Sequence, residues 1–155
     1  MISSTAYRVA ENTPDAVNER IRRQTEETIA RYRNADPEAI ERRLAELDRE
    51  WDIERSIETE SAFMILLGMA LGTSVHRGFL MIPAMASSML LLHNTEGWYP
   101  LLPIFRRLGI RTQREISAER YALKALRGDF DQVESGSGDG AKRTRAFEAA
   151  RPTGR

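Results

Sequence analysis

The 155-residue chain contains no cysteine, which excludes disulfides, thiol nucleophiles and thiolate metal ligands. The sequence also lacks phosphate-binding glycine loops, dinucleotide-binding fingerprints, nucleophile elbows and histidine-rich metal motifs. We therefore expect no catalytic residues, no cofactor and no metal, and we interpret the protein as non-enzymatic.

Charge is nearly absent from the middle of a chain that is otherwise 30% charged. Residues 61–105 carry only Arg77 and Glu96. Residues 1–60 hold 10 basic and 15 acidic side chains, whereas residues 106–155 hold 12 basic and 7 acidic ones. An apolar region thus separates an acidic region from a basic one.

The acidic region contains the start signals of two helices. Thr13-Pro14 and Asp36-Pro37 each combine an N-cap residue with a proline suited to the first helical position. Apolar residues at helical spacing follow in the second helix: Ile40, Leu44, Leu47, Trp51 and Ile57. We predict an irregular arm over residues 1–12 and a cytoplasmic helix pair over residues 13–60. Since no Gly or Pro interrupts Pro37–Leu67, we expect the second helix to continue into the apolar region.

The apolar region consists of two segments, Ser61–His76 and Phe79–Thr95, on either side of the turn Arg77-Gly78. Their 16 and 17 residues lie near the lower limit of a membrane-spanning helix. Both segments are apolar on every side, and such helices must be surrounded by protein or lipid. The other helices offer only narrow apolar stripes. We therefore predict a short two-helix transmembrane hairpin over residues 61–95; the core of a soluble helical bundle is the alternative.

The borders of the hairpin predict its orientation. Aromatic residues followed by arginines are typical of a membrane–water interface. Basic residues flank the hairpin on both sides, and its turn carries a single arginine. The positive-inside rule then places both termini in the cytoplasm and the protein in the inner membrane. The predicted membrane-interface residues are Trp98, Tyr99, Arg106, Arg107 and Arg111.

Small residues at a spacing of four occur in both segments. Gly68 and Gly72 share one helix face, as do Ala84 and Ser88, and such faces allow helix backbones to approach closely. We predict a helix-packing role for these four residues, either within one hairpin or between two chains. We also expect Pro83 to kink the second segment.

The two histidines lie near the ends of the segments. His76 adjoins the turn, whereas His93 lies roughly 21 Å beyond Phe79 along a helix. An antiparallel hairpin places them at opposite ends, so we do not expect them to share a metal or haem.

After the hairpin, we predict an interfacial segment followed by an amphipathic helix, together spanning residues 96–130. Thr112 and Glu115 have the spacing of a capping box, and Gly128 suits a helix end. Residues 131–155 are rich in Gly, Ser and charge, and we predict a disordered tail there.

The segment "GWYPLLPIFRRLGIRT" carries a family resemblance. An apolar hairpin containing Gly68, then Gly97 and Pro100, then the ending Leu108-Gly109-Ile110 before Thr112, resembles the small inner-membrane domain of bacterial membrane-bound rhodanese of the YgaP type. The resemblance covers about residues 57–112 and implies two membrane-spanning helices that can form a homodimer. Tyr99 stands where that family often has cysteine, and no rhodanese domain is present.

The leading functional interpretation is a small integral inner-membrane protein that acts as a membrane-anchored interaction or accessory protein. Its partners would be the lipid bilayer and a second copy or another membrane protein. The alternative is a soluble helical-bundle interaction module, and a transport or channel component is a weaker one. We expect no nucleic acid, because Glu115 and Glu119 interrupt the basic segment. The candidate partner surface is Leu44, Leu47 and Trp51.

Overall fold

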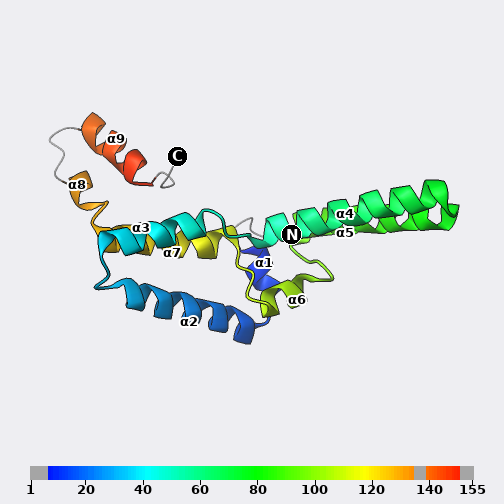
Figure 1. Cartoon of the computed structure of the whole chain (residues 1–155), viewed down its shortest axis with the longest axis horizontal. Coiled ribbons are helices and arrows are strands. Elements are labelled where there is room, and N and C mark those ends of the chain that lie inside the picture. Colours follow the sequence, from blue (N-terminus) through cyan, green and yellow to red (C-terminus); the bar gives the residue numbers. More distant parts are fainter. Residues whose placement is uncertain (1–6, 135–138, 151–155) are drawn as a thin grey trace. The chain divides into compact units, whose positions relative to one another are not determined.

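The computed structural model describes residues 7–134 and 139–150. This part of the chain consists of helices and connecting turns without a strand, which confirms the predicted all-α class (Figure 1). The helices are α1 (Arg8–Glu11), α2 (Asp15–Tyr32), α3 (Pro37–Leu47), α4 (Ile53–Ser74), the 3₁₀ helix η1 (Arg77–Leu80), α5 (Met81–Glu96), α6 (Leu102–Arg107), α7 (Gln113–Arg127), α8 (Asp131–Glu134) and α9 (Asp139–Ala150).

The chain forms two units, each built from segments that are distant in sequence. Unit 1 comprises Met1–Ile21 and Trp51–Gln113, and unit 2 comprises Arg22–Glu50 and Arg114–Arg155. The division therefore does not follow the five consecutive segments expected from composition. The acidic helix pair belongs partly to each unit, because the division falls inside α2 and after α3.

The core of unit 1 gathers around the first turns of α4. Ile53 and Ile57 are fully buried there against Val9, Tyr99 and Leu102. Two bonds define where α4 begins: the Asp52 side chain accepts from the Arg55 backbone N–H at 2.8 Å, and the Ile53 N–H donates to the Arg111 carbonyl at 2.9 Å. An N-cap of this kind starts a new helix. The predicted continuous helix from Pro37 is therefore wrong, because α3 ends at Leu47.

Helices α4 and α5 lie side by side and antiparallel, and they form the hairpin expected from the sequence (Figure 1). The turn at His76 is closed locally, since the His76 ring nitrogen accepts from the Gly78 N–H at 3.0 Å. Helix α5 ends at Gly97, whose positive φ of 78° favours glycine. A side chain at Gly97 would also meet the Arg8 carbonyl oxygen at 2.6 Å.

Pro83 occupies the third position of α5. The N–H groups of the first turn have no partner within their own helix, so a proline there removes no bond of the α-helical ladder. The position of Pro83 therefore provides no reason for a kink.

The hairpin departs from the expectation in length and apolarity. Helix α4 begins with charged turns before Ser61, and α5 has only 16 residues. Across residues 7–134 and 139–150, no helix combines the length and the apolar character needed to cross a membrane.

Unit 2 has its own core, in which α3 packs against α7 (Figure 1). Ile40, Leu44 and Leu47 project from α3 at the predicted helical spacing and meet Ile116 and Leu123 of α7. The region expected to be a disordered tail holds α8 and α9. This corrects the prediction for Asp131–Glu134 and Asp139–Ala150, whereas residues 135–138 and 151–155 lie outside the described part of the chain.

Leu44→Ala tests this core. Leu44 is fully buried, so the truncation leaves a cavity and should lower the free energy of unfolding by about 2–5 kcal/mol. Leu126→Ala is the matched control, because Leu126 lies on α7 and is 41% exposed. Chemical denaturation followed by circular dichroism measures both changes. Equal effects of the two substitutions would contradict the assignment of Leu44 to the core.

Candidate functional site

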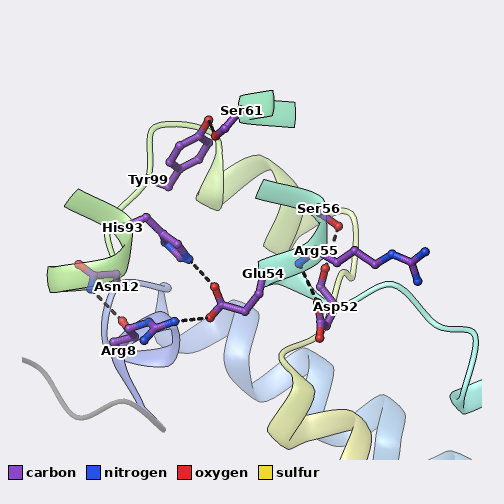
Figure 2. A network of polar contacts seen from close by, with 9 residues as sticks. All are labelled: Arg8, Asn12, Asp52, Glu54, Arg55, Ser56, Ser61, His93 and Tyr99. Atoms are coloured by element: carbon purple, nitrogen blue, oxygen red, sulfur yellow. Dashed lines mark hydrogen bonds and ion pairs between the residues drawn. The ribbon is translucent and has the colours of Figure 1, made fainter. Parts of the chain in front are cut away.

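The open end of the hairpin holds a polar cluster that joins its two helices (Figure 2). Glu54, from the first turn of α4, meets His93, from the last turn of α5, with 2.7 Å between Oε2 and Nε2. The other carboxylate oxygen of Glu54 accepts from Arg8 Nη2 at 2.9 Å. His93 is only 1% exposed. One carboxylate thus connects α4, α5 and the N-terminal helix α1.

A second set of contacts lies beside this cluster. The Tyr99 hydroxyl donates to the Glu60 carboxylate and lies 3.0 Å from Ser61 Oγ. Its ring meets the His93 ring edge to face, with 6.0 Å between centroids and 78° between planes. Tyr99 is buried together with Ser61 and His93, so the two sets of polar contacts form one interior network.

Asn12 completes the attachment of α1 to the hairpin. Its side-chain Nδ2 donates to the carbonyl of Arg8 and to that of Glu96, at 2.8 Å each. Both distances are ordinary for an N–H···O hydrogen bond. The Glu96 carbonyl belongs to the last turn of α5, where carbonyls lack partners in their own helix. Asn12 therefore also satisfies the end of α5.

The electrostatics of the cluster favour an ionised Glu54. The hydrogen bond from His93 lowers the pKa of Glu54 below its ordinary value of 4.5, burial opposes this shift, and the positive charge of Arg8 supports it. Burial raises the pKa of Tyr99, and the bond to the Glu60 carboxylate adds to the effect. Tyr99 therefore stays a neutral donor while Glu54 stays a charged acceptor.

This arrangement holds three helix ends at one point by ion pairing and hydrogen bonding. In the described residues, no group of three or more His, Cys, Asp or Glu side chains is placed to hold a metal ion. His76, in the turn, lies at the other end of the hairpin from His93, as the sequence predicted.

Sequence reasoning missed the Glu54–His93 pair, although one signal was available. An antiparallel hairpin brings the end of its second helix back beside the start of its first. His93 lies near the end of the second apolar segment, and the acidic residues Glu54, Glu58 and Glu60 precede the first segment. The register needed to choose Glu54 among them depends on the conformation of the turn, which spacing alone does not reveal.

The hairpin is closed by glycines on one face of α4. A Cβ at Gly68 would overlap Pro83 Cδ and lie 2.8 Å from Ile82 Cβ, and a Cβ at Gly72 would overlap the Leu80 side chain. Both glycines therefore lie where α4 approaches the following segment within one chain. Ala84 and Ser88, by contrast, are exposed on α5, and Ser88 Oγ donates to the Ala84 carbonyl at 2.8 Å.

The outer faces of the hairpin are apolar and exposed. Leu66 is 70% exposed and Phe63 is 62% exposed on α4. Other exposed large apolar side chains of the hairpin are Leu67, Met69, Val75, Phe79, Leu80, Met81, Met85, Leu91 and Leu92. We call the side chains of these eleven residues the apolar band. The described residues leave this surface uncovered.

The residues predicted to lie at a membrane interface separate into two groups. Trp98 and Arg107 are exposed. Tyr99, Arg106 and Arg111 are buried in unit 1, which corrects their predicted position at a lipid border. The reason is local: Tyr99 joins the polar network, and Arg106 donates to Asn18 Oδ1 at 2.9 Å rather than to a headgroup.

The three residues of the predicted partner surface differ in exposure. Leu44 and Leu47 are buried in the core of unit 2, so they present no surface to a partner. Trp51 is nearly half exposed, with the Arg55 guanidinium 4.4 Å above its ring. That stacking is a favourable cation–π contact.

Unit 2 has a concavity of about 380 Å³ lined by Thr28, Arg31, Tyr32, Ala35, Arg43 and Glu46. Arg43 donates to Glu119 at 2.8 Å and to Glu46 at 2.9 Å. Burial opposes ionisation of Arg43, but these two carboxylates raise its pKa above its ordinary value. The charge of Arg43 is therefore already paired with two carboxylates within unit 2.

Comparison with known proteins adds no relative: no family model, curated protein or solved structure matches the chain. The resemblance to the membrane domain of the rhodanese family therefore stays a prediction.

Gly68→Ile tests the close approach within the hairpin. The new side chain has no space beside Pro83 and Ile82, so it should separate α4 from α5 and lower the free energy of unfolding by about 1–3 kcal/mol. Ala70→Ile is the control, because Ala70 is exposed on the same helix. Thermal unfolding in a mild detergent measures both. Unchanged stability of the Gly68 variant would rule out the tight contact.

Glu54→Gln tests the polar cluster. Because the pKa of Glu54 is lower in the folded state, the unfolded state binds a proton first as the pH falls. Its contribution is therefore complete above pH 4.5 and declines at lower pH. The variant should lose about 1–2 kcal/mol at pH 7 and show a weaker decline in acid. Glu58→Gln, exposed on the same helix, is the control. Parallel stability curves for wild type and Glu54→Gln from pH 7 to pH 3 would contradict the assignment.

Proposed function

We propose that the protein is a non-enzymatic, membrane-anchored interaction or accessory protein whose α4–α5 hairpin lies in a lipid bilayer. The observation that carries the proposal is the apolar band. Most of its members belong to α4 and α5, and Leu66 and Phe63 are 70% and 62% exposed. An exposed apolar surface of this kind marks a contact with a membrane or another protein.

The inner faces of the hairpin cannot serve as this contact. Gly68 and Gly72 already lie against Pro83 and Leu80, so each helix covers one face of the other. The outer faces remain, and they carry no formal charge between Ser61 and His76. Burying a Leu or Phe side chain stabilises by about 1.5–3 kcal/mol. Transfer of the whole band into lipid would therefore supply a large driving force.

The length of the hairpin determines how deeply it inserts. Each apolar arm of 16 to 17 residues measures about 25 Å at the helical rise, against a hydrocarbon core about 30 Å thick. A bilayer accommodates a short segment by thinning, and long basic side chains extend to the headgroups. Arg77 in the turn is the side chain that would do so.

The polar cluster supports an insertion from one side. Glu54, His93 and Arg8 lie together where the apolar arms begin, so the charged groups are paired at the expected bilayer border. Both termini would then remain on the cytoplasmic side of the inner membrane, in agreement with the distribution of basic residues. The resemblance to a small inner-membrane domain favours the same arrangement.

Fractionation of expressing cells tests the proposal. The wild-type protein should stay with the membranes through a carbonate wash. Leu66→Glu combined with Met85→Glu places two charges in the apolar band and should release most of the protein. The control pair is Tyr121→Glu with Leu126→Glu, which alters two exposed residues of α7 in unit 2. Release of the wild-type protein by carbonate would favour a protein partner over lipid.

Because the chain contains no cysteine, a single introduced thiol can report how deeply the hairpin inserts into the membrane. Arg77→Cys provides a single thiol in the turn, and a membrane-impermeant maleimide added to intact spheroplasts reports its exposure. We expect labelling from outside, because the turn should reach the outer headgroups. Glu38→Cys, on the exposed surface of α3, should label only after lysis. Labelling of both thiols in intact spheroplasts would contradict the predicted orientation.

A further inference from the structure

The segment that follows the hairpin presents a second exposed face. Pro103, Ile104, Arg107 and Leu108 are all exposed, and their spacing places them on one side of α6. Leu102 and Arg106, on the other side, are buried. Leu108 is 74% exposed and Ile104 is 53% exposed. This exposed set, which we call the α6 face, is apolar apart from Arg107.

The α6 face is held firmly by unit 1. Leu102 packs in the core with Ile53 and Ile57 of α4. Arg106 donates to Asn18 Oδ1 at 2.9 Å and to the Ile110 carbonyl at 3.1 Å. Arg20 Nη2 donates to the Arg107 carbonyl at 2.8 Å. Apolar and polar contacts thus leave α6 little freedom to turn Ile104 and Leu108 inward.

The segment that carries this face contains basic residues and no acidic one. Gly97–Thr112 contains three arginines and no acidic residue, and of the three only Arg107 is exposed. Trp98, which immediately follows the end of α5, is also exposed. An exposed Trp, two large aliphatic side chains and one arginine form the combination that binds at the headgroup level of a bilayer, where apolar side chains enter the acyl boundary and basic ones meet lipid phosphate.

We propose that the α6 face, with Trp98, docks on the surface of an anionic phospholipid bilayer and sets the depth at which the hairpin stops. This inference rests on the proposed function, since it requires the hairpin to be in lipid. Ile104 and Leu108 lie in the acyl boundary, and Arg107 contacts the phosphate of an anionic headgroup. The occupant is lipid because the segment follows the apolar hairpin in the chain and because the one charged side chain of the face, Arg107, is basic.

Single-cysteine variants of the full chain in vesicles test the inference. Leu108→Cys is reacted with an impermeant maleimide in phosphatidylcholine vesicles with and without phosphatidylglycerol. Leu66→Cys reports on the hairpin, and Glu38→Cys provides the rate of a water-exposed thiol. With anionic lipid present, Leu108→Cys should react at least about tenfold more slowly than Glu38→Cys.

The role of Arg107 is tested by comparing labelling rates in anionic and neutral vesicles. Labelling of Leu108→Cys should be about fivefold slower in anionic than in neutral vesicles, the factor expected for one basic residue at a charged surface. Arg107→Gln in the same background should abolish that difference. Equal rates in the two lipids with Arg107 present would overturn the anionic preference.

The outcomes separate the two proposals. Protection of Leu66→Cys with free reaction of Leu108→Cys would overturn the docking of α6 and leave the hairpin in lipid. Free reaction of both thiols would overturn the proposed function together with this inference. Protection of Leu108→Cys that disappears when the protein is diluted in excess lipid would identify a second copy as the occupant and overturn the assignment to lipid.

Discussion

The close approach of α4 to α5 is the constraint on which the rest of unit 1 depends. Gly68 and Gly72 leave no space for a side chain where α4 meets Ile82, Pro83 and Leu80, so the hairpin closes on two glycines of α4. Helices on a protein surface usually turn their large apolar side chains toward the core, whereas eleven such side chains of the hairpin are exposed.

The same pairing brings charges together at the open end. Antiparallel helices return the end of α5 to the start of α4, and the Glu54 carboxylate there meets two cationic or hydrogen-bonding partners, Arg8 and His93. A partly buried carboxylate is stable only when such partners satisfy it. The cluster therefore lies where the apolar part of the hairpin ends and a polar part of unit 1, linked by hydrogen bonds, begins.

The residues around Tyr99 show what composition leaves undecided. The order of aromatics and arginines after the hairpin predicted a membrane interface, and of the residues assigned to it Trp98 and Arg107 are exposed. Tyr99 and Arg106 are also an aromatic residue and an arginine, and each is adjacent in sequence to one of these exposed residues. Both are nevertheless buried. Neighbouring residues along a chain point in different directions, so composition does not decide which side chains face outward.

Local patterns in the sequence by themselves determined the helical class, the position of the turn near Arg77 and the apolar stripe Ile40–Leu44–Leu47. These features depend on capping, glycine and the 3.6-residue period, which act over a few residues. Only the tertiary structure decided that the stripe is covered by α7, that Glu54 rather than Glu58 meets His93, and that the chain divides into two interleaved units. Those outcomes depend on contacts between residues far apart in the chain, and the register of such contacts is set by packing rather than by any local signal.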